Sequence, residues 1–376
     1  MLFKRYTLFR FFGFPVQADL SWALLSILFI WTLSEVYFPA SLPGMDTNAY
    51  AWMSTAGFFG LLLSILAHET AHAVIAEYYR MPIKAIVLFI FGGVAEMNSD
   101  PPSPKAEARM AIAGPIMSLL LGFFFTANSI MGWEWFRSHA VVEVSSFLAL
   151  VNFLIAGFNI IPAFPLDGGR IYRAWLWKRS DNFVSATRRA AKLGQAFGFL
   201  LLGYSAYLIT REQFVSGIWW AIVGLMLSAG GSMAVRLSES RSVLSGQPVR
   251  RFLHESIMTV APDMTLNEFM DSYVQKHFFS AFPVVDHGKL RGIIHLEDVL
   301  GKERSRWAWM TIGTVMRQVE PDHLVAPDHD CADALETMRE KGLTRLFVAE
   351  GEALYGIVQR GDLTDFLMVN LALRDG

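Results

Sequence analysis

The chain has 376 residues, of which 53% are hydrophobic and 18% are charged. Soluble proteins of this length are rarely so apolar, so the composition indicates a membrane protein. The formal net charge of −2 provides no positive field for nucleic acid, and we expect no nucleic-acid partner. Most of the apolar excess lies before about residue 237, and the rest of the chain has the polar and apolar alternation of a soluble domain. Its only cysteine, Cys331, excludes a disulfide framework and fits a reducing compartment.

The first 17 residues, MLFKRYTLFRFFGFPVQ, are basic and aromatic. They lack the short apolar core and small-residue cleavage site of a secretory signal peptide, so we expect them to be retained. Basic and aromatic side chains together are typical of a segment that lies along a membrane surface. We therefore predict an amphipathic surface segment here.

Six stretches are long and apolar enough to cross a bilayer, whose core of about 30 Å requires roughly 20 apolar residues in a helix. The fifth stretch is the weakest, because Gln195 and three glycines dilute it. The predicted spans are residues 19–38, 55–79, 109–131, 142–162, 193–210 and 216–235.

Lys and Arg are concentrated in alternate segments between these spans. The opposite loops hold only Arg137 and Arg211. Because cytoplasmic loops carry the excess of basic residues, we predict that both termini and the domain after about residue 245 face the cytoplasm. The basic residues of that side are Lys4, Arg5, Arg10, Arg80, Lys84, Lys105, Arg109, Arg170, Arg173, Lys178, Arg179, Arg188, Arg189 and Lys192.

Two segments interrupt the helical pattern. Residues 83–97 follow Pro82 and predict two short strands around Gly92-Gly93. Residues 162–170 (PAFPLDGGR) contain two prolines and two glycines at the end of the fourth span. Irregular backbone at membrane depth persists only where protein or a water-filled cavity covers it. Each segment is equally compatible with an ordinary cytoplasmic loop.

The second span contains His-Glu-Thr-Ala-His at residues 68–72. Residues four apart share one face of a helix, so His68 and His72 can bind one metal ion, and two imidazoles on a rigid helix suit zinc. Glu69, about 100° around the helix from His68, would act as general base and then as acid toward the leaving amine. Zinc lowers the pKa of a bound water to about 7. The alternative is a structural histidine pair, although buried ionisable groups in a span usually mark function.

A catalytic zinc site needs a third protein ligand and one open position. Asp167 is the acidic residue that lies near an apolar span end within unusual backbone, although a turn aspartate before two glycines is common. Asn152 and Asn159 lie in the fourth span, and a buried amide must find hydrogen-bond partners. Either could hold a substrate carbonyl or steady an oxyanion, or could join helices. Asn159 is the closer of the two to Asp167.

These residues resemble the site-2 protease family of intramembrane zinc metalloproteases. The resemblance covers roughly residues 10–235 and rests on four motifs, which are HETAH at 68–72, FGGVAEM at 91–97, AGP at 113–115 and FNIIPAFPLDGGR at 158–170.

The resemblance implies a role for each site residue. His68, His72 and Asp167 would bind one zinc ion per chain, and Glu69 would be catalytic. Asn159 would contact the substrate or the oxyanion, and a hairpin at Gly92-Gly93 would lie in the membrane and pair with an extended substrate. That pairing also answers a physical need, because a helical substrate hides its carbonyls and must unwind before water can attack.

The polar tail contains an internal repeat. Residues 282–300 correspond to residues 346–367, with Gly292 matching Gly356 and Asp298 matching Asp362. Each copy predicts a proline-containing lead, an amphipathic helix, two strands and a second helix. The tail resembles a pair of cystathionine-β-synthase (CBS) modules.

Such pairs often bind adenine nucleotides such as ATP or AMP between the repeats. Asp298 and Asp362 are plausible ribose ligands, because a carboxylate can accept two hydroxyl bonds. The Ser/Thr of the usual motif is His295 in one copy and Gln359 in the other, which puts phosphate contact in doubt. A module for homodimerisation or docking, without nucleotide, is the alternative.

We therefore expect a polytopic α-helical membrane protein with about six transmembrane helices and a membrane-embedded β-hairpin, followed by a cytoplasmic α+β CBS-pair domain. The expected domains are residues 1–245 and 246–376, with CBS repeats at about 249–301 and 311–370. The predicted function is intramembrane cleavage of a membrane-spanning protein substrate in a prokaryotic plasma membrane, modulated by nucleotide. A CBS-gated transporter or channel without peptidase activity, and a degenerate relative that only binds a partner, are the alternatives.

Overall fold

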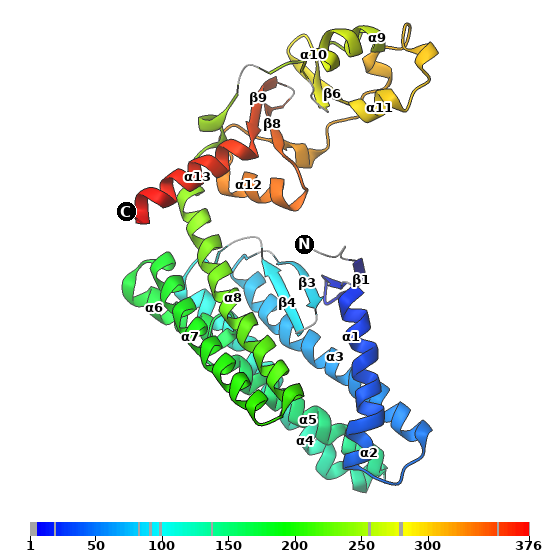
Figure 1. Cartoon of the computed structure of the whole chain (residues 1–376), viewed down its shortest axis with the longest axis vertical. Helices are drawn as coiled ribbons and strands as arrows, with labels where there is room; N and C mark the ends of the chain where they lie inside the picture. Colours follow the sequence, from blue (N-terminus) through cyan, green and yellow to red (C-terminus); the bar gives the residue numbers. More distant parts are fainter. Residues whose placement is uncertain are drawn as a thin grey trace. The chain divides into compact units, whose positions relative to one another are not determined.

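The chain divides into two compact units in a computed structural model (Figure 1). Unit 1 is Met1–Arg236 and unit 2 is Leu237–Gly376. The structure describes residues 6–18, 20–81, 83–89, 92–97, 100–136, 138–254, 257–277, 281–351 and 353–375.

Long apolar helices dominate unit 1. Among the described residues, five helices have the length and composition to cross a membrane, and they coincide with the second to sixth predicted spans. The N-termini of α3 and α7 are capped by side chains: Asp46 Oδ1 accepts a hydrogen bond from Ala49 N at 2.6 Å, and Asn182 Oδ1 accepts one from Ser185 N at 2.8 Å. The five helices are α3 (Thr47–Tyr78), α4 (Pro104–Phe136), α5 (His139–Ile160), α7 (Phe183–Thr210) and α8 (Phe214–Leu244).

The first predicted span corresponds to a helical run that changes type along its length. It consists of α1 (Leu20–Thr32), one π-helical turn η1 (Leu33–Tyr37) and α2 (Phe38–Ser41). None of these pieces alone has the length of a membrane span. A count of six transmembrane helices therefore stays a prediction.

A four-stranded sheet accompanies the helices. Its order is β1 (Tyr6–Phe11), β2 (Phe14–Ala18), β3 (Ile83–Phe89) and β4 (Gly92–Met97). Both hairpins are antiparallel, and β2 joins β3 in parallel through the register Val16↔Ile86. Val16, Ile86 and Leu88 pack in a buried cluster with Leu66 of α3, so the sheet lies against the helix that carries the histidines.

The sheet gives the N-terminal segment a defined structure, and its location along the membrane surface stays a prediction. Residues 6–18 form the β1–β2 hairpin, whose turn uses positive φ angles at Phe12 (47°) and Gly13 (88°). The β2 strand also pairs with β3, far along the chain, and local sequence pattern could not reveal that contact.

The two short strands predicted around Gly92-Gly93 are confirmed as β3 and β4, and their depth in the membrane stays a prediction. Gly92 and Gly93 are the first residues of β4 and pair with Phe89 and Leu88. Residues 90 and 91, between the strands, lie outside the described residues.

Unit 2 is built around one five-stranded sheet. The strand order is β5 (Ala281–Asp286), β6 (Lys289–His295), β9 (Ala353–Gln359), β8 (Arg345–Glu350) and β7 (Leu324–Val325). Its helical elements are η2 (Val249–Phe252), α9 (Leu266–Phe269), η3 (Met270–Val274), α10 (Gln275–His277), α11 (Leu296–Leu300), η4 (Arg304–Arg306), η5 (Ile312–Thr314), η6 (Pro321–His323), α12 (Cys331–Glu340) and α13 (Arg360–Asp375).

The internal repeat predicted from the sequence is visible in strand register. Val284 pairs with Gly292 in the first copy, and Val348 pairs with Gly356 in the second. Each hairpin has a register shift immediately after that valine. Equivalent glycines and equivalent irregularities show that the two copies share one fold.

The leads of the two copies exchange places. His254, in the lead of the first copy, forms an isolated bridge with Ile357 of the second copy. Arg317, in the lead of the second copy, forms one with Ile293 of the first. The two copies are therefore interlocked rather than successive.

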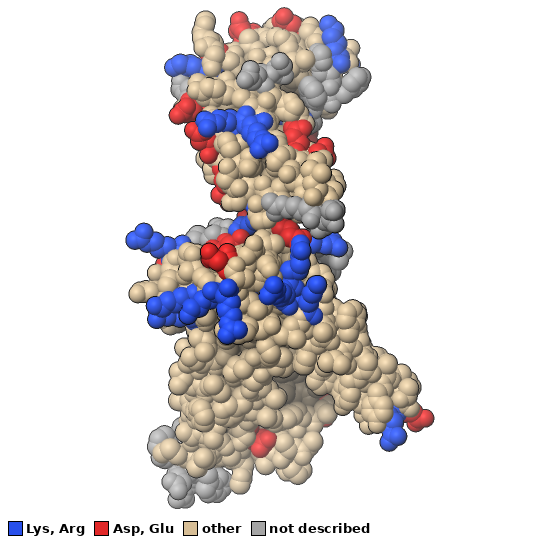
Figure 2. All heavy atoms as spheres, turned by 90° about the vertical axis from the view of Figure 1, so that its left-hand side faces the viewer, with Lys and Arg blue, Asp and Glu red and all other residues tan. Residues whose placement is uncertain are grey.

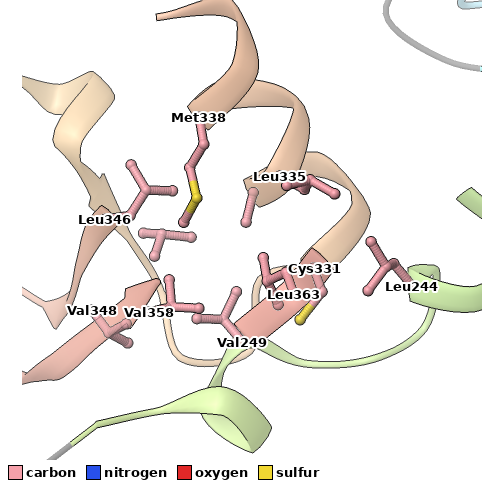
Figure 3. Close-up of a cluster of buried hydrophobic side chains, with 11 residues drawn as sticks. Leu244, Val249, Cys331, Leu335, Met338, Leu346, Val348, Val358 and Leu363 are labelled. Carbon is pink, nitrogen blue, oxygen red and sulfur yellow. The ribbon is translucent and has the colours of Figure 1, made fainter. Parts of the chain in front are cut away.

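An apolar core among the described residues of unit 2 includes the end of the α8 helix. Figure 3 shows Leu244, the last residue of α8, beside Cys331 and Leu335 of α12. Val249 lies in the same cluster, so the start of the first copy is built into the core of the second. Burial raises the pKa of the Cys331 thiol to about 11, so this cysteine is an inert part of the core.

Candidate metal centre

Three side chains from distant parts of the chain converge in unit 1. His68 and His72 lie one helical turn apart on α3, and Asp167 is the first residue of α6 (Asp167–Ser180). Asp167 Oδ2 lies 3.3 Å from His68 Nε2 and 3.2 Å from His72 Nε2, and the two Nε2 atoms are 3.2 Å apart. All three residues are buried. The described residues hold no other group of three His, Cys, Asp or Glu side chains close enough to share a metal.

The neighbouring helix α4 orients both imidazoles through their other ring nitrogens. His72 Nδ1 donates a hydrogen bond to the carbonyl oxygen of Met110 at 2.7 Å, and His68 Nδ1 is hydrogen-bonded to Ser118 Oγ at 2.8 Å. Such partners fix the tautomer and direction of metal-binding histidines. Both Nε2 atoms therefore face the same point, and each offers a lone pair to a metal when Nδ1 of its ring carries the proton.

Gly114 of α4 leaves the space in front of these nitrogens. A Cβ atom at this position would lie 2.2 Å from His72 Nε2 and 2.5 Å from His68 Nε2. No side chain could occupy that place without displacing an imidazole. Two imidazole nitrogens and a carboxylate oxygen around such a gap match the donor set of a catalytic zinc site.

The backbone before Asp167 is tightly folded. The α5 helix ends at Ile160, and residues 161–166 make two short-range turns in which Ala163 N donates to Ile161 O and Leu166 N donates to Ala163 O. A Cβ atom on Gly168 would lie 2.1 Å from Ile160 O, so this glycine allows α6 to begin directly against the end of α5. The predicted break in the fourth span thus places Asp167 beside the histidines.

Glu69 lies between the two histidines in sequence and is buried. Gly93 of β4 is in close contact with it, because a Cβ atom there would lie 2.8 Å from Glu69 Cγ. The start of β4 therefore lies directly on the side chain that we predict to be the general base.

The two asparagines of α5 have different surroundings. Asn152 is fully buried, and its Nδ2 donates to Ser64 Oγ of α3 at 3.0 Å, so it joins two helices. Asn159 is half-buried, and its Nδ2 donates to Ile155 O within its own helix at 3.1 Å. The described contacts of Asn159 do not reach His68, His72 or Asp167.

Sequence reasoning missed the contribution of α4. Met110, Gly114 and Ser118 follow one another at intervals of four residues and so lie along one face of that helix. The AGP motif at 113–115 contributes to the resemblance to site-2 proteases, but its sequence alone does not indicate that Gly114 faces the histidines.

Comparison with known proteins agrees with this geometry. Residues 56–138 and 133–203 match the sequence model of Peptidase family M50, and residues 249–304 and 312–369 match that of the CBS domain. The chain is 30% identical to Rip3 of Mycobacterium tuberculosis, a protein named as a zinc metalloprotease, over 96% of this chain and 92% of the relative.

The chain belongs to peptidase family M50, the site-2 proteases.

Two further comparisons lead to Methanocaldococcus jannaschii. Zinc metalloprotease MJ0392 is 30% identical over 95% of this chain and 94% of its own length. The solved structure of the site-2 protease from this organism shares 26% identity, with a TM-score of 0.44, and covers 62% of this chain and 96% of its own. As a member of this family, the chain is an integral membrane zinc metalloprotease with CBS repeats. The matches do not favour the alternative of a CBS-gated transporter.

The predicted nucleotide ligands of unit 2 lie at the two interlocked leads. Asp298 Oδ1 accepts a hydrogen bond from Arg317 Nε at 2.9 Å, and Asp362 Oδ2 is hydrogen-bonded to His254 Nε2 at 2.7 Å. Asp298 Oδ2 is buried without a hydrogen-bond partner among the described residues. His295, at the position of the motif's Ser/Thr, precedes α11 without a side-chain capping bond.

Proposed function

We propose that the chain is an intramembrane endopeptidase that hydrolyses a peptide bond in or near a transmembrane segment of a membrane-tethered protein. The observation that carries this proposal is the convergence of His68, His72 and Asp167 on helices that belong to a set of membrane-length apolar segments. Ionisable side chains are costly inside apolar membrane helices, so a cluster of them there indicates a functional site.

In this proposal His68, His72 and Asp167 hold one zinc ion. When bound, zinc would activate a water molecule and polarise the scissile carbonyl. Glu69 takes the proton of the attacking water and returns it to the leaving amine, as a general base and then a general acid. The buried position of Glu69, next to both histidines in sequence and against Gly93, supports this role.

Asn159 would contact the substrate carbonyl or the oxyanion. It lies one residue before the end of α5, on the element that leads into the turns preceding Asp167. Its amide is bonded only within its own helix and is half-exposed, so it can turn toward a substrate without breaking a contact between elements.

The strand β4 would bind the unwound substrate. It is the last strand in the order of its sheet, and within the described part of the chain no further strand pairs with its outer edge. A strand edge binds an extended peptide through backbone hydrogen bonds. Because Gly93 contacts Glu69, a substrate added along Gly92 and Gly93 would lie beside the proposed base.

The distribution of charge supports a cytoplasmic opening and cytoplasmic termini. On the face of unit 1 seen in Figure 2, Lys and Arg gather near one end of the helices, and the surface along the helices is almost free of charge. Lys178 and Arg179 lie in the last turn of α6, the helix that begins with Asp167. This arrangement favours an orientation with Asp167 near the cytoplasmic side of the membrane.

Unit 2 would regulate cleavage by binding an adenine nucleotide at Asp298 and Asp362, or would form a homodimer. The helix α8 offers a route to the site. Its residue Leu227 packs in a buried cluster with Ala163 and Leu166, which directly precede Asp167. The last residue of the same helix lies in the core of unit 2, where Arg241 also forms an ion pair with Glu336.

The metal content of the purified full-length chain tests the zinc ligands. We expect about one zinc per chain in the wild type and none in His72→Ala, because catalytic sites need three protein ligands. His139→Ala is the matched control, since His139 lies at the exposed start of α5 and should not affect zinc. A His72→Ala chain that retains its zinc would disprove the site.

A further inference from the structure

A buried ion pair joins the helix of Asp167 to the helix that orients the histidines. Arg173 of α6 and Glu107 of α4 are 7% and 0% exposed. Arg173 Nε donates to Glu107 Oε1 at 2.7 Å, and its Nη2 contacts the same oxygen. Neither residue belongs to the predicted metal site.

Two aromatic rings and a threonine hydroxyl also contact the guanidinium group of Arg173. Its guanidinium carbon lies 4.9 Å from the ring centre of Phe164 and 4.7 Å from that of Phe183, and Nη1 donates to Thr187 Oγ1 at 3.4 Å. Phe164 belongs to the turns that precede Asp167. Arg173 therefore fixes both the helix that starts at Asp167 and the backbone that leads into it.

Glu107 has no other cationic partner in its described contacts. Its Oε2 atom is buried without a hydrogen-bond partner among the described residues. A buried carboxylate without its cation is strongly unfavourable, so α6 cannot move away from α4 without a large penalty.

The ion pair lies on the same stripe of α4 as the groups that orient the histidines. Glu107, Met110, Gly114 and Ser118 are spaced by three, four and four residues, which places them on one helical face. Glu107 and Gly114 are roughly 10 Å apart along α4, and Arg173 and Asp167 are roughly 9 Å apart along α6 at 1.5 Å per residue. These two separations are similar. The ion pair can therefore fix the position of α6 against α4 at Arg173, and through α6 the position of Asp167 against the face of α4 that carries Gly114.

We propose that Arg173 and Glu107 are positioning residues that hold Asp167 at the correct place relative to His68 and His72. This inference rests on the proposed zinc site. One face of α4 then determines all three ligands, two through hydrogen bonds to the imidazoles and the third through the ion pair.

The test must separate positioning from simple stabilisation. Arg173→Met alone leaves a buried charge and can misfold, so the main variant is the double substitution Glu107→Leu/Arg173→Met. Replacement of a buried ion pair by apolar residues of similar volume often preserves stability. The control is Arg241→Met/Glu336→Leu, which removes an ion pair of the same chemistry in unit 2.

Two readouts are measured on the full-length chain in detergent. These are zinc affinity by chelator competition, and the visible absorption of the Co²⁺-substituted protein, which reports ligand geometry. We expect the double variant to unfold at the wild-type temperature, to bind zinc about 10–100-fold more weakly, and to have an altered Co²⁺ spectrum. The control should match the wild type in both readouts.

A folded double variant with wild-type zinc affinity and Co²⁺ spectrum would overturn the inference. If the double variant does not fold, Arg173→Lys decides, because it keeps the charge but loses the two-pronged, stacked geometry. Weaker zinc binding by Arg173→Lys supports positioning, and unchanged binding overturns it. A wild-type chain that binds no zinc would instead disprove the metal site, and the inference with it.

Discussion

His68 Nδ1 lies 2.8 Å from Ser118 Oγ, so the first histidine of the HETAH motif is oriented by a helix fifty residues further along the chain. His72 is oriented by Met110 of the same helix. The histidine pair is set by local spacing on α3, but the direction in which both rings point is set by α4. Substitutions on α4 should therefore affect zinc binding even though α3 carries both histidines.

Gly114→Ala should abolish tight zinc binding. The new methyl group would lie within 2.5 Å of both His68 Nε2 and His72 Nε2, so at least one ring must rotate away. We expect zinc affinity to fall by about 10–100-fold or more, as for other losses of ligand orientation. Gly157→Ala on α5 is the matched control, because a Cβ there would meet no atom within 4 Å. Equal zinc affinity in the two variants would show that the gap beside Gly114 is not a metal site.

Gly93→Ala should impair turnover while zinc stays bound. Its Cβ would approach Glu69 Cγ to 2.8 Å, and the flexible glutamate side chain would move rather than the strand. Because misplacement of a catalytic group by about 1 Å can cost about 10²-fold, kcat should fall by that order. Gly203→Ala, where a Cβ meets no atom within 4 Å, should have no effect. Loss of zinc by Gly93→Ala would argue that β4 supports the metal rather than the base.

Some of this site could be predicted from the sequence alone. The HETAH spacing predicts two ligands and a base, because the geometry of a helix relates residues one and four apart without any tertiary information. Asp167 could be proposed from a broken span. Its approach to the histidines depends on Gly168 and on the turns after Ile160, which the sequence indicates but does not place.

Other features depend on contacts between distant residues. The pairing of β2 with β3 joins the N-terminal hairpin to a strand that begins at Ile83, and no local sequence pattern indicates this contact. The exchange of His254 and Arg317 between the CBS copies is likewise invisible in an alignment of the two repeats. The stripe of α4 that faces the site consists of ordinary residues whose roles arise only from packing.

Asp298→Asn and Asp362→Asn should weaken the binding of ATP or AMP to the full-length chain. A hydrogen bond to a charged group contributes about 1.5–3 kcal/mol, which corresponds to a loss of roughly tenfold or more for each variant. Asp328→Asn is the control, since Asp328 is exposed and pairs with Arg250. Nucleotide titration by calorimetry measures the effect. Absence of binding in the wild type would favour the docking or dimerisation alternative.

Insertion of Gly-Gly-Ser between Arg236 and Leu237 should uncouple regulation from cleavage. The insertion interrupts α8 between Leu227, which packs near Asp167, and Leu244, which lies in the core of unit 2. We expect basal cleavage to persist and its response to nucleotide to disappear. The same insertion at the exposed turn between His287 and Gly288 should preserve the response. A response that survives interruption of α8 would exclude this helix as the route.

The most direct test of the account compares membrane peptides from cells whose only copy of the chain is wild type or Glu69→Gln, together with the zinc content of each purified protein. The substitution retains the shape of the side chain but removes the base. We expect cleavage of membrane-spanning segments to fall by about 10²–10⁴-fold, as for loss of other general bases, while zinc remains at the wild-type level. Undiminished cleavage by Glu69→Gln would contradict the proposed mechanism.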